Sequence, residues 1–323
     1  MRIKLLLTIA LLCLASLPAL AQVNDTYVIP VAGNVPGNFG TRWMTQFSIM
    51  NPHLDHSLKV RITFLPTGGG GDADDTLTVT LPPNSVAYSD NILGEVFERA
   101  GSGALLVATF ADENPGVENT VLARSFLVTS NTFNNAASGT YGQTIPGVWA
   151  GLLDVDSDGI TSIAQGIRNL SSEGWRTNVG AVNLGRCTAT VYVSVYDVDG
   201  HRLSETPFNV PPLGHIQDRL PTEVDMGSIE FYVNDPCVND DAKYAVVFPY
   251  TSTIDQLSGD PTYQSPTLLA SPSSVFAKGK KIESTTALGK KIDSTIAARA
   301  RAEARDLGEA SLVRIKGRWQ IVK

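Results

Sequence analysis

The chain has 323 residues, of which 43% are hydrophobic and 18% are charged, with 28 glycines and 18 prolines. That much apolar material excludes a globally disordered chain, and the abundance of turn formers is typical of proteins built from many short strands. The net charge of -7 disfavours a nucleic-acid partner, because an acidic surface repels phosphates.

The first 21 residues have the three-part pattern of a cleaved export signal. Arg2 and Lys4 give a positive start, and the apolar run over 5–15 is shorter than the roughly 20 residues that a membrane span needs. Ala19-Leu20-Ala21 then offers small residues to a signal peptidase. We expect the protein to be secreted to the periplasm, the cell surface or the medium; a retained membrane anchor is the alternative.

Two segments 132 residues apart share one pattern. Trp43–Asn51 and Trp175–Asn183 both read Trp, any residue, Thr, amide, apolar, small, apolar, apolar, Asn. Further blocks match in the same order, and six collinear blocks predict a duplicated domain. Among the matched pairs are Val79–Pro83 with Phe208–Pro212, Asp90–Leu93 with Asp218–Leu220, Gly101-Ser102 with Gly227-Ser228, and Ser138–Gln143 with Ser258–Gln264.

Period-two alternation between turn residues predicts about seven strands in the first copy, at roughly 27–32, 43–50, 58–65, 76–81, 85–89, 103–109 and 120–128. That count is typical of an immunoglobulin-like sandwich; a jelly roll or another Greek-key sandwich fits nearly as well. We therefore predict an all-β protein with two tandem immunoglobulin-like antiparallel β-sandwich domains. The expected parts are a signal peptide (1–21), a first sandwich (22–147), an acidic linker (148–160), a second sandwich (161–270) and a basic tail (271–323).

Two segments carry a resemblance to a known repeat. "YVIPVAGNVPGNFGTRWMTQFSIMNP" and "GIRNLSSEGWRTNVGAVNLG" look like a repeat found in secreted, uncharacterised bacterial proteins with immunoglobulin-like sandwich domains. The resemblance covers residues from about 27 to 270. It implies an exported surface or extracellular module, and it brings no known activity and no functional residues.

Trp43 and Trp175 open equivalent predicted strands. We expect each indole to cap a domain core against the opposite sheet, because packing is what duplicated copies must share. Stacking on a sugar is the alternative.

Cys187 and Cys237 remain after removal of the signal. Two cysteines in an exported chain predict one disulfide, which would stabilise the fold by roughly 3–4 kcal/mol through closure of a loop of about 50 residues. Two free thiols are the alternative, and a metal site lacks the necessary CxxC or neighbouring histidine.

Asp154, Asp156 and Asp158, followed by Gly159, resemble the opening of an EF-hand-type calcium loop. The twelfth position is Gln165 instead of a bidentate Glu, so an acidic turn between domains is the preferred interpretation. We expect no cofactor, with calcium as the alternative. No other metal site is predicted, since the loop histidines His53 and His56 lack an evident third ligand.

Catalytic motifs are absent from the sequence: there is no HExxH, no GxSxG and no phosphate-binding glycine loop. We therefore predict a non-enzymatic cell-surface or extracellular module with a binding or structural role. The alternatives are a carbohydrate-binding protein or weak hydrolase, and a calcium-dependent adhesion module. Tyr192 and Tyr196 lie on one side of a predicted strand and are the expected glycan contacts; the expected partner is an extracellular protein or an envelope polysaccharide.

The C-terminal segment differs in charge from the rest. Residues 272–323 hold 12 Lys/Arg against 5 Asp/Glu. Residues 297–309 favour a helix, and alternation over 313–321 is compatible with a terminal hairpin or an extended end. A cationic arm on anionic lipid or polysaccharide is the functional interpretation. The preferred one is a helical or disordered tail, with folding back on the acidic domains as a further alternative.

Overall fold

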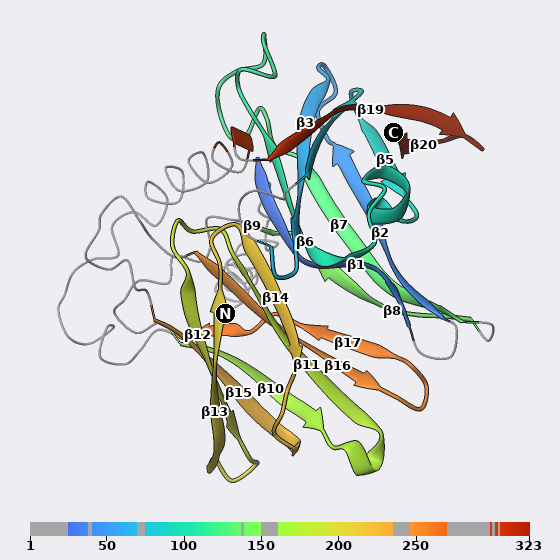
Figure 1. Ribbon diagram of the computed structural model, residues 1–323. Coiled ribbons are helices and arrows are strands. Elements are labelled where there is room, and N and C mark those ends of the chain that lie inside the picture. Colours follow the sequence, from blue (N-terminus) through green and yellow to red (C-terminus); the bar gives the residue numbers. More distant parts are fainter. Residues whose placement is uncertain are drawn as a thin grey trace, which may run out of the picture.

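The computed structural model describes residues 25–37, 41–69, 75–136, 139–149, 161–234, 246–269, 298, 301–302 and 304–323. The predicted signal peptide, most of the predicted linker and residues 270–297 lie outside these ranges. Strands dominate the described residues, which confirms the all-β prediction (Figure 1). Helical geometry within them is confined to η2 (Ile92–Val96), η3 (Ser171–Glu173) and residues 298 and 301–302. None of these helical segments is long and apolar enough to cross a bilayer.

Eleven strands from the two ends of the chain share one sheet. Eight of them close a ring in the order β1-β2-β5-β20-β19-β4-β3-β6 and back to β1, so this part, here called the barrel unit, is a barrel and not the predicted sandwich. The bounds are β1 (Thr26–Pro36), β2 (Arg42–Asn51), β3 (Leu58–Pro66), β4 (Asp75–Leu81), β5 (Ser85–Ser89), β6 (Gly101–Thr109), β7 (Leu127–Ala136), β8 (Gly139–Pro146), β9 (Val148–Trp149), β19 (Arg305–Ile315) and β20 (Arg318–Val322).

The hairpin of β19 and β20 closes the barrel. It lies between β4 and β5 and runs parallel to each, with Ala310 opposite Val79 and Trp319 opposite Ala87. The side chain of Ile321 is fully buried in the barrel core. The helix predicted over 297–309 is therefore wrong from Arg305 onward, where a strand begins. Two open strand edges supply pairing partners that outweigh the local helix propensity.

The remaining strands form two sheets that pack face to face, here called the two-sheet unit (Figure 1). A shared core lies between the sheets and includes Ile167, Val179, Val193 and Ile229. The five-stranded sheet has the order β13-β12-β15-β10-β18 and the four-stranded sheet the order β14-β11-β16-β17. The bounds are β10 (Thr161–Asn169), β11 (Trp175–Asn183), β12 (Ala189–Tyr196), β13 (Arg202–Val210), β14 (Gly214–Arg219), β15 (Val224–Asn234), β16 (Val247–Asp255), β17 (Pro261–Gln264) and β18 (Thr267–Leu269).

One pairing scheme occurs in both units. Without the terminal hairpin, the strands of the barrel unit pair in two series, β4-β3-β6-β1-β9 and β5-β2-β7-β8. These series correspond strand for strand to the two sheets of the other unit. The scheme differs from the immunoglobulin order, in which the first strand pairs with the second in an ABED sheet. In the two-sheet unit β10 pairs with β15, and β11 pairs with β16. The strand order is therefore not that of the predicted immunoglobulin-like domain.

Buried hydrogen bonds explain the shared sequence pattern. Asn51 and Asn183 end equivalent strands and are fully buried. The side-chain amide of each donates to a carbonyl at the end of a neighbouring strand: Asn51 to Leu81 at 3.3 Å and Asn183 to Val210 at 3.0 Å. Each also accepts the backbone N–H two residues further on, at 3.0 and 2.7 Å. Because buried amides must be hydrogen-bonded, the repeated Asn is a requirement of the fold.

The two tryptophans do not occupy the predicted place. Trp43 and Trp175 are both half-buried, and neither belongs to a hydrophobic core cluster. Each is at or next to the first residue of its strand, where the facing sheet no longer covers it. The prediction that they cap the cores is wrong.

An apolar layer joins the two units. Val28, Leu65 and Leu106 of the barrel unit pack against Val182 and Phe248 of the two-sheet unit. Because these side chains point away from the core of their own unit, each unit contributes an outer sheet face. The units are therefore packed together through hydrophobic surface of the kind found in a domain core.

Candidate functional site

Three tyrosines lie on the outer face of β12 and β15. The valines of β12 point into the core of the two-sheet unit, so Tyr192 and Tyr196 point outward by strand alternation. Tyr192 is directly opposite Tyr232 in the strand register, and their ring centroids are 6.1 Å apart. We call Tyr192, Ser194, Tyr196, Glu230 and Tyr232 the tyrosine face.

Polar groups lie between the rings of the tyrosine face. The hydroxyl of Tyr196 donates to Glu230 Oε2 at 2.8 Å, and this hydrogen bond raises the pKa of Tyr196. Ser194 donates to Glu205 on β13 at 3.0 Å. Tyr232 is 43% exposed. The sheet thus presents aromatic faces together with carboxylate and hydroxyl groups that can hydrogen-bond to a ligand.

The barrel unit uses the same position for packing. The register places Leu65 opposite Ala104 in the barrel unit, and Ser194 opposite Glu230 in the two-sheet unit. Counting from the matched Gly101 and Gly227, Leu106 corresponds to Tyr232. Leu65, Ala104 and Leu106 are buried in the layer between the units, whereas their counterparts face outward. The tyrosine face is therefore not needed to hold the units together.

The structure brings some predicted site residues together and leaves others outside its described part. Tyr192 and Tyr196 lie on one face as predicted from alternation. The sequence did not single out Glu230, although its place between the inward Ile229 and Phe231 of β15 marks it as outward-facing. Cys187 is disulfide-bonded. Cys237 lies outside the described residues, as do the predicted calcium ligands Asp154, Asp156 and Asp158.

One acidic group among the described residues has metal-like spacing, at the turn between β12 and β13. It consists of Asp197, Asp199 and His201. The Asp197 carboxylate accepts the backbone N–H of His201 and of Asp199, each at 2.9 Å, and these bonds lower its pKa. Its oxygens are already used to shape the turn, so we assign it that structural role.

The histidines of the 52–57 loop brace that loop. The rings of His53 and His56 stack with centroids 4.3 Å apart. Their Nε2 atoms lie 2.9 Å from the carbonyl oxygens of Ser125 and Ala123, respectively. The loop is thus tied to the segment before β7.

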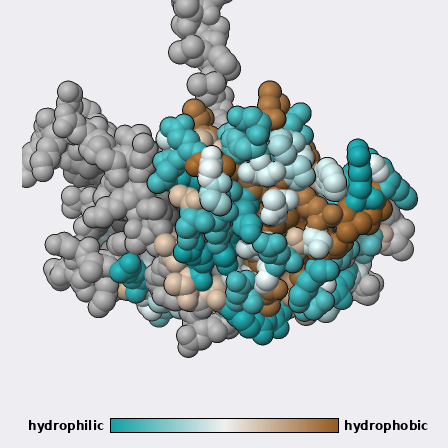
Figure 2. Space-filling view, turned by 90° about the horizontal axis from the view of Figure 1, so that it is seen from above, coloured by the Kyte–Doolittle hydropathy of each residue, from teal (hydrophilic) through white to brown (hydrophobic). Residues whose placement is uncertain are grey.

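The basic C-terminal segment makes ion pairs with the barrel unit. Arg301 lies 2.9 Å from Asp112, and Lys323 lies 3.0 Å from Glu98. Arg305 lies 2.7 Å from Asp75, a carboxylate that is almost fully buried. Figure 2 views the end of the molecule that carries this hairpin, where hydrophilic side chains surround hydrophobic ones. These residues therefore fold back on the acidic domain, which was one of the alternatives for this segment. A contact with anionic surfaces stays a prediction.

Comparisons with known proteins identify no family. No family model matches the chain, and no curated protein matches it. Solved structures with a weak likeness include three of Bacteroides uniformis beta-glucuronidase. The calcium-binding mutant of beta-glucuronidase 2 has 11% identity and a TM-score of 0.13, and the enzyme bound covalently to cyclophellitol-6-carboxylate aziridine has 12% and 0.14. Each match covers 71% of this chain and 26% of the other.

Proposed function

We propose that the protein is a secreted, non-enzymatic binding module and that its tyrosine face binds an envelope polysaccharide. The observation that carries this proposal is the tyrosine face itself. Three tyrosines and two hydrogen-bonding side chains share one outward sheet surface. The counterparts of Ser194, Glu230 and Tyr232 in the barrel unit are the packed aliphatic side chains Leu65, Ala104 and Leu106. Exposed aromatic and polar side chains without a packing role are characteristic of binding surfaces.

A sugar chain fits the shape and chemistry of this surface. Tyrosine combines an apolar ring with a polar hydroxyl, so it can contact the C–H face of a sugar and also bond to its hydroxyl groups. The side chains of Glu230, Glu205 and Arg202 lie at the same surface, with Arg202 2.9 Å from Glu205. An extended sheet face suits a polymer better than a small molecule, which is usually held in a concave pocket.

The location and the lack of catalysis rest on the sequence. The predicted export signal supports a place outside the cytoplasm, and the resemblance of residues 27–270 to a repeat of secreted bacterial proteins agrees with it. The sequence contains no HExxH, GxSxG or phosphate-binding glycine loop. The calcium-dependent adhesion alternative depends on Asp156 and its neighbours, and it predicts a calcium-induced rise in melting temperature that Asp156→Ala abolishes.

Binding to polysaccharides tests the proposal directly. We would measure retention of residues 22–323 in affinity gels that contain purified envelope polysaccharides. Tyr192→Ala and Tyr232→Ala should each weaken binding about tenfold, a loss of roughly 1.4 kcal/mol. Tyr88→Ala is the matched control because Tyr88 lies on β5 of the barrel unit. Equal retention of all variants, or binding only to an extracellular protein, would show that the tyrosine face is not a polysaccharide site.

A further inference from the structure

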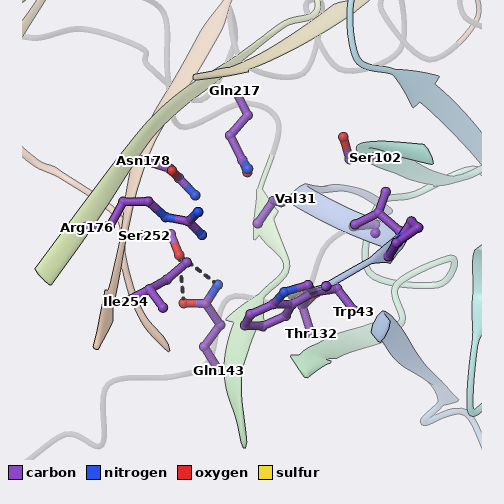
Figure 3. Close-up of a pocket in the computed structure, with 15 residues that line it drawn as sticks. Val31, Trp43, Ser102, Thr132, Gln143, Arg176, Asn178, Gln217, Ser252 and Ile254 are labelled. Atoms are coloured by element: carbon purple, nitrogen blue, oxygen red, sulfur yellow. Dashed lines mark hydrogen bonds between the residues drawn. The ribbon is translucent and has the colours of Figure 1, made fainter. Parts of the chain in front are cut away.

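A cavity lies between the two units, away from the tyrosine face. It has a volume of about 240 Å³. The barrel unit contributes Trp43, Thr132 and Gln143, and the two-sheet unit contributes Arg176 and Gln217 (Figure 3). We call this cavity the inter-unit cleft. Its volume is close to the lower end of small-molecule pockets, which begin near 300 Å³, so it suits a ligand of about one ring.

Arg176 brings an uncompensated cation to the cleft. Its Nε is buried and has no hydrogen-bond partner, and no described carboxylate lies within ion-pair distance of its guanidinium. Burial, followed by the nearby Arg219, lowers the pKa of Arg176. Figure 3 shows the guanidinium directed into the cleft from β11. A half-buried guanidinium without a counter-ion is costly unless something pairs with it.

The other walls supply hydrogen-bonding groups and one aromatic surface. Gln143 of β8 and Ser252 of β16 bond to each other across the cleft, at 3.1 and 3.2 Å. The amides of Asn178 and Gln217 also line it, and the indole of Trp43 faces the arginine side (Figure 3). A ligand here would meet a cation, neutral donors and acceptors, and a flat apolar wall.

The equivalent groove of the two-sheet unit, lined by Trp175, Thr253 and Gln264, has a volume of about 540 Å³, but an arginine lies over its tryptophan. There the guanidinium of Arg168 lies over the ring of Trp175, 5.2 Å from its centroid. Trp175 corresponds to Trp43, and the position of Arg168 corresponds to Gly33. Val35 pairs with Trp43, and Leu170 exchanges both backbone hydrogen bonds with Trp175, so Gly33 and Arg168, each two residues earlier, occupy equivalent positions.

Thr45 and Thr177 are the matched threonines of the repeat. Thr45 Oγ1 accepts the N–H of Gly33, and Thr177 Oγ1 donates to the carbonyl of Arg168. A Cβ added to Gly33 would meet no atom within 4 Å. Glycine at this position therefore leaves open, beside Trp43, the space that an arginine fills beside Trp175.

We propose that the inter-unit cleft binds a small sugar that carries a carboxylate. The carboxylate pairs with Arg176, whose planar guanidinium suits bidentate contact. One face of the sugar ring lies against the indole of Trp43, and the amides of Gln217 and Asn178 bond to its hydroxyl groups. This site is independent of the polysaccharide surface.

Titration calorimetry with two sugars that differ only in the carboxylate tests the proposal. Full-length mature protein (22–323) should bind D-galacturonate, and it should bind D-galactose at least tenfold more weakly. Arg176→Gln should lower the affinity for galacturonate at least tenfold, because a hydrogen bond to a charged group is lost. Equal binding of the two sugars, or no effect of Arg176→Gln, would overturn the proposal. So would the absence of measurable galacturonate binding.

A second variant keeps the test valid if Arg176→Gln disturbs the interface. Gly33→Arg recreates the arrangement of the other groove and should weaken galacturonate binding at least tenfold, because the new side chain takes the place of the sugar ring over Trp43. Arg202→Gln is the matched control, because it removes an arginine at the tyrosine face and should leave galacturonate binding unchanged. Wild-type affinity in a folded Gly33→Arg variant would place the ligand elsewhere and overturn the proposal.

Discussion

The barrel unit and the two-sheet unit share one pairing scheme, but two equivalent strand edges are covered in the first and open in the second. In the barrel unit the terminal hairpin fills the space between β4 and β5. In the two-sheet unit the corresponding strands, β13 and β14, stay at the edges of separate sheets. The comparison shows that a duplicated unit of this kind is stable with open or closed edges, provided that the edge strands suit their surroundings.

The edge strands differ in composition in the expected way. β4 reads DTLTVTL and is buried at six of its seven positions, whereas β13 reads RLSETPFNV and is buried only at its last residue. Charged side chains and a proline, here Arg202, Glu205 and Pro207, keep an open edge from pairing with other chains. β4 has no such protection along its interior and depends on the hairpin for cover.

Removal of the hairpin should cause the largest loss of stability, and this loss should be confined to the barrel unit. Deletion of 301–323 exposes the edges of β4 and β5, removes Ile321 from the core and takes Arg305 from the buried Asp75. Ile321 and Ala310 are buried, and Leu307, Leu312 and Trp319 are partly buried. At up to about 1.5–3 kcal/mol for each large side chain, their loss is comparable to the whole stability of a domain. Hydrogen exchange should show lost protection in β3–β6 and little change in β12 and β13. Preserved protection of β4 would contradict the dependence of the barrel on its hairpin.

A single substitution in the hairpin also tests whether the barrel depends on it, with a smaller expected loss of stability. Ile321 is fully buried, so Ile321→Ala should lower the free energy of unfolding by about 2–5 kcal/mol. Ile315 in the same hairpin is 40% exposed, and Ile315→Ala should change stability by no more than about 0.5 kcal/mol. Urea unfolding of both variants measures the difference. Similar losses would mean that the hairpin is not inserted in the core as described.

Sequence reasoning was sufficient for whatever depends on local pattern. Alternation located six of the seven strands predicted for the first copy; the seventh, at 120–128, overlaps β7 (Leu127–Ala136) only at its last two residues. The repeated blocks identified positions that have the same buried hydrogen bonds in both units, such as Asn51 and Asn183. The outward direction of Tyr192 and Tyr196 also followed from alternation. These features are predictable because strand period and buried polar groups leave a direct mark on the sequence.

Features that depend on distant partners were not predictable. The segment after Arg305 carries both helix-favouring and alternating residues, and the open edges of β4 and β5, more than 200 residues earlier, decide between them. The opposition of Tyr192 and Tyr232 requires the register between β12 and β15. The inter-unit cleft requires the packing of two units. No single segment of the sequence contains this information.

The layer between the units should be sensitive to acid through one histidine. His215 is fully buried between Thr67 Oγ1 at 2.7 Å and the hydroxyl of Tyr250 at 2.8 Å, and burial lowers its pKa to about 3. In the unfolded chain this histidine takes up a proton near pH 6.5, whereas in the folded protein it does so only near pH 3. The free energy of unfolding should therefore be highest above pH 6.5 and should fall as the pH decreases from 6.5 to about 3. The slope is at most about 1.4 kcal/mol per pH unit, or about 2 kcal/mol between pH 6.5 and 5.

Comparison of His215→Gln with the unchanged protein isolates this contribution. The variant should lose the part of the pH dependence that belongs to His215, as measured by urea unfolding at pH 7 and pH 5. The counterpart of His215 in the barrel unit is Val86, which is 48% exposed, and Val86→Ala should keep the slope of the wild type. An unchanged slope in His215→Gln would assign the acid sensitivity to other groups.

The smallest predicted effect tests whether the two units are equivalent in energy as well as in geometry. Thr45 and Thr177 are fully buried, and each hydroxyl lies 2.8 Å from a second threonine, Thr132 or Thr253. Replacement by Val keeps the shape and leaves the partner hydroxyl and one backbone group unpaired, so each variant should lose about 1–2 kcal/mol. Unit-resolved hydrogen exchange should place each loss in its own unit. If Thr45→Val is costly and Thr177→Val is neutral, closure of the barrel has changed what the shared hydrogen bond contributes, and the equivalence is geometric alone.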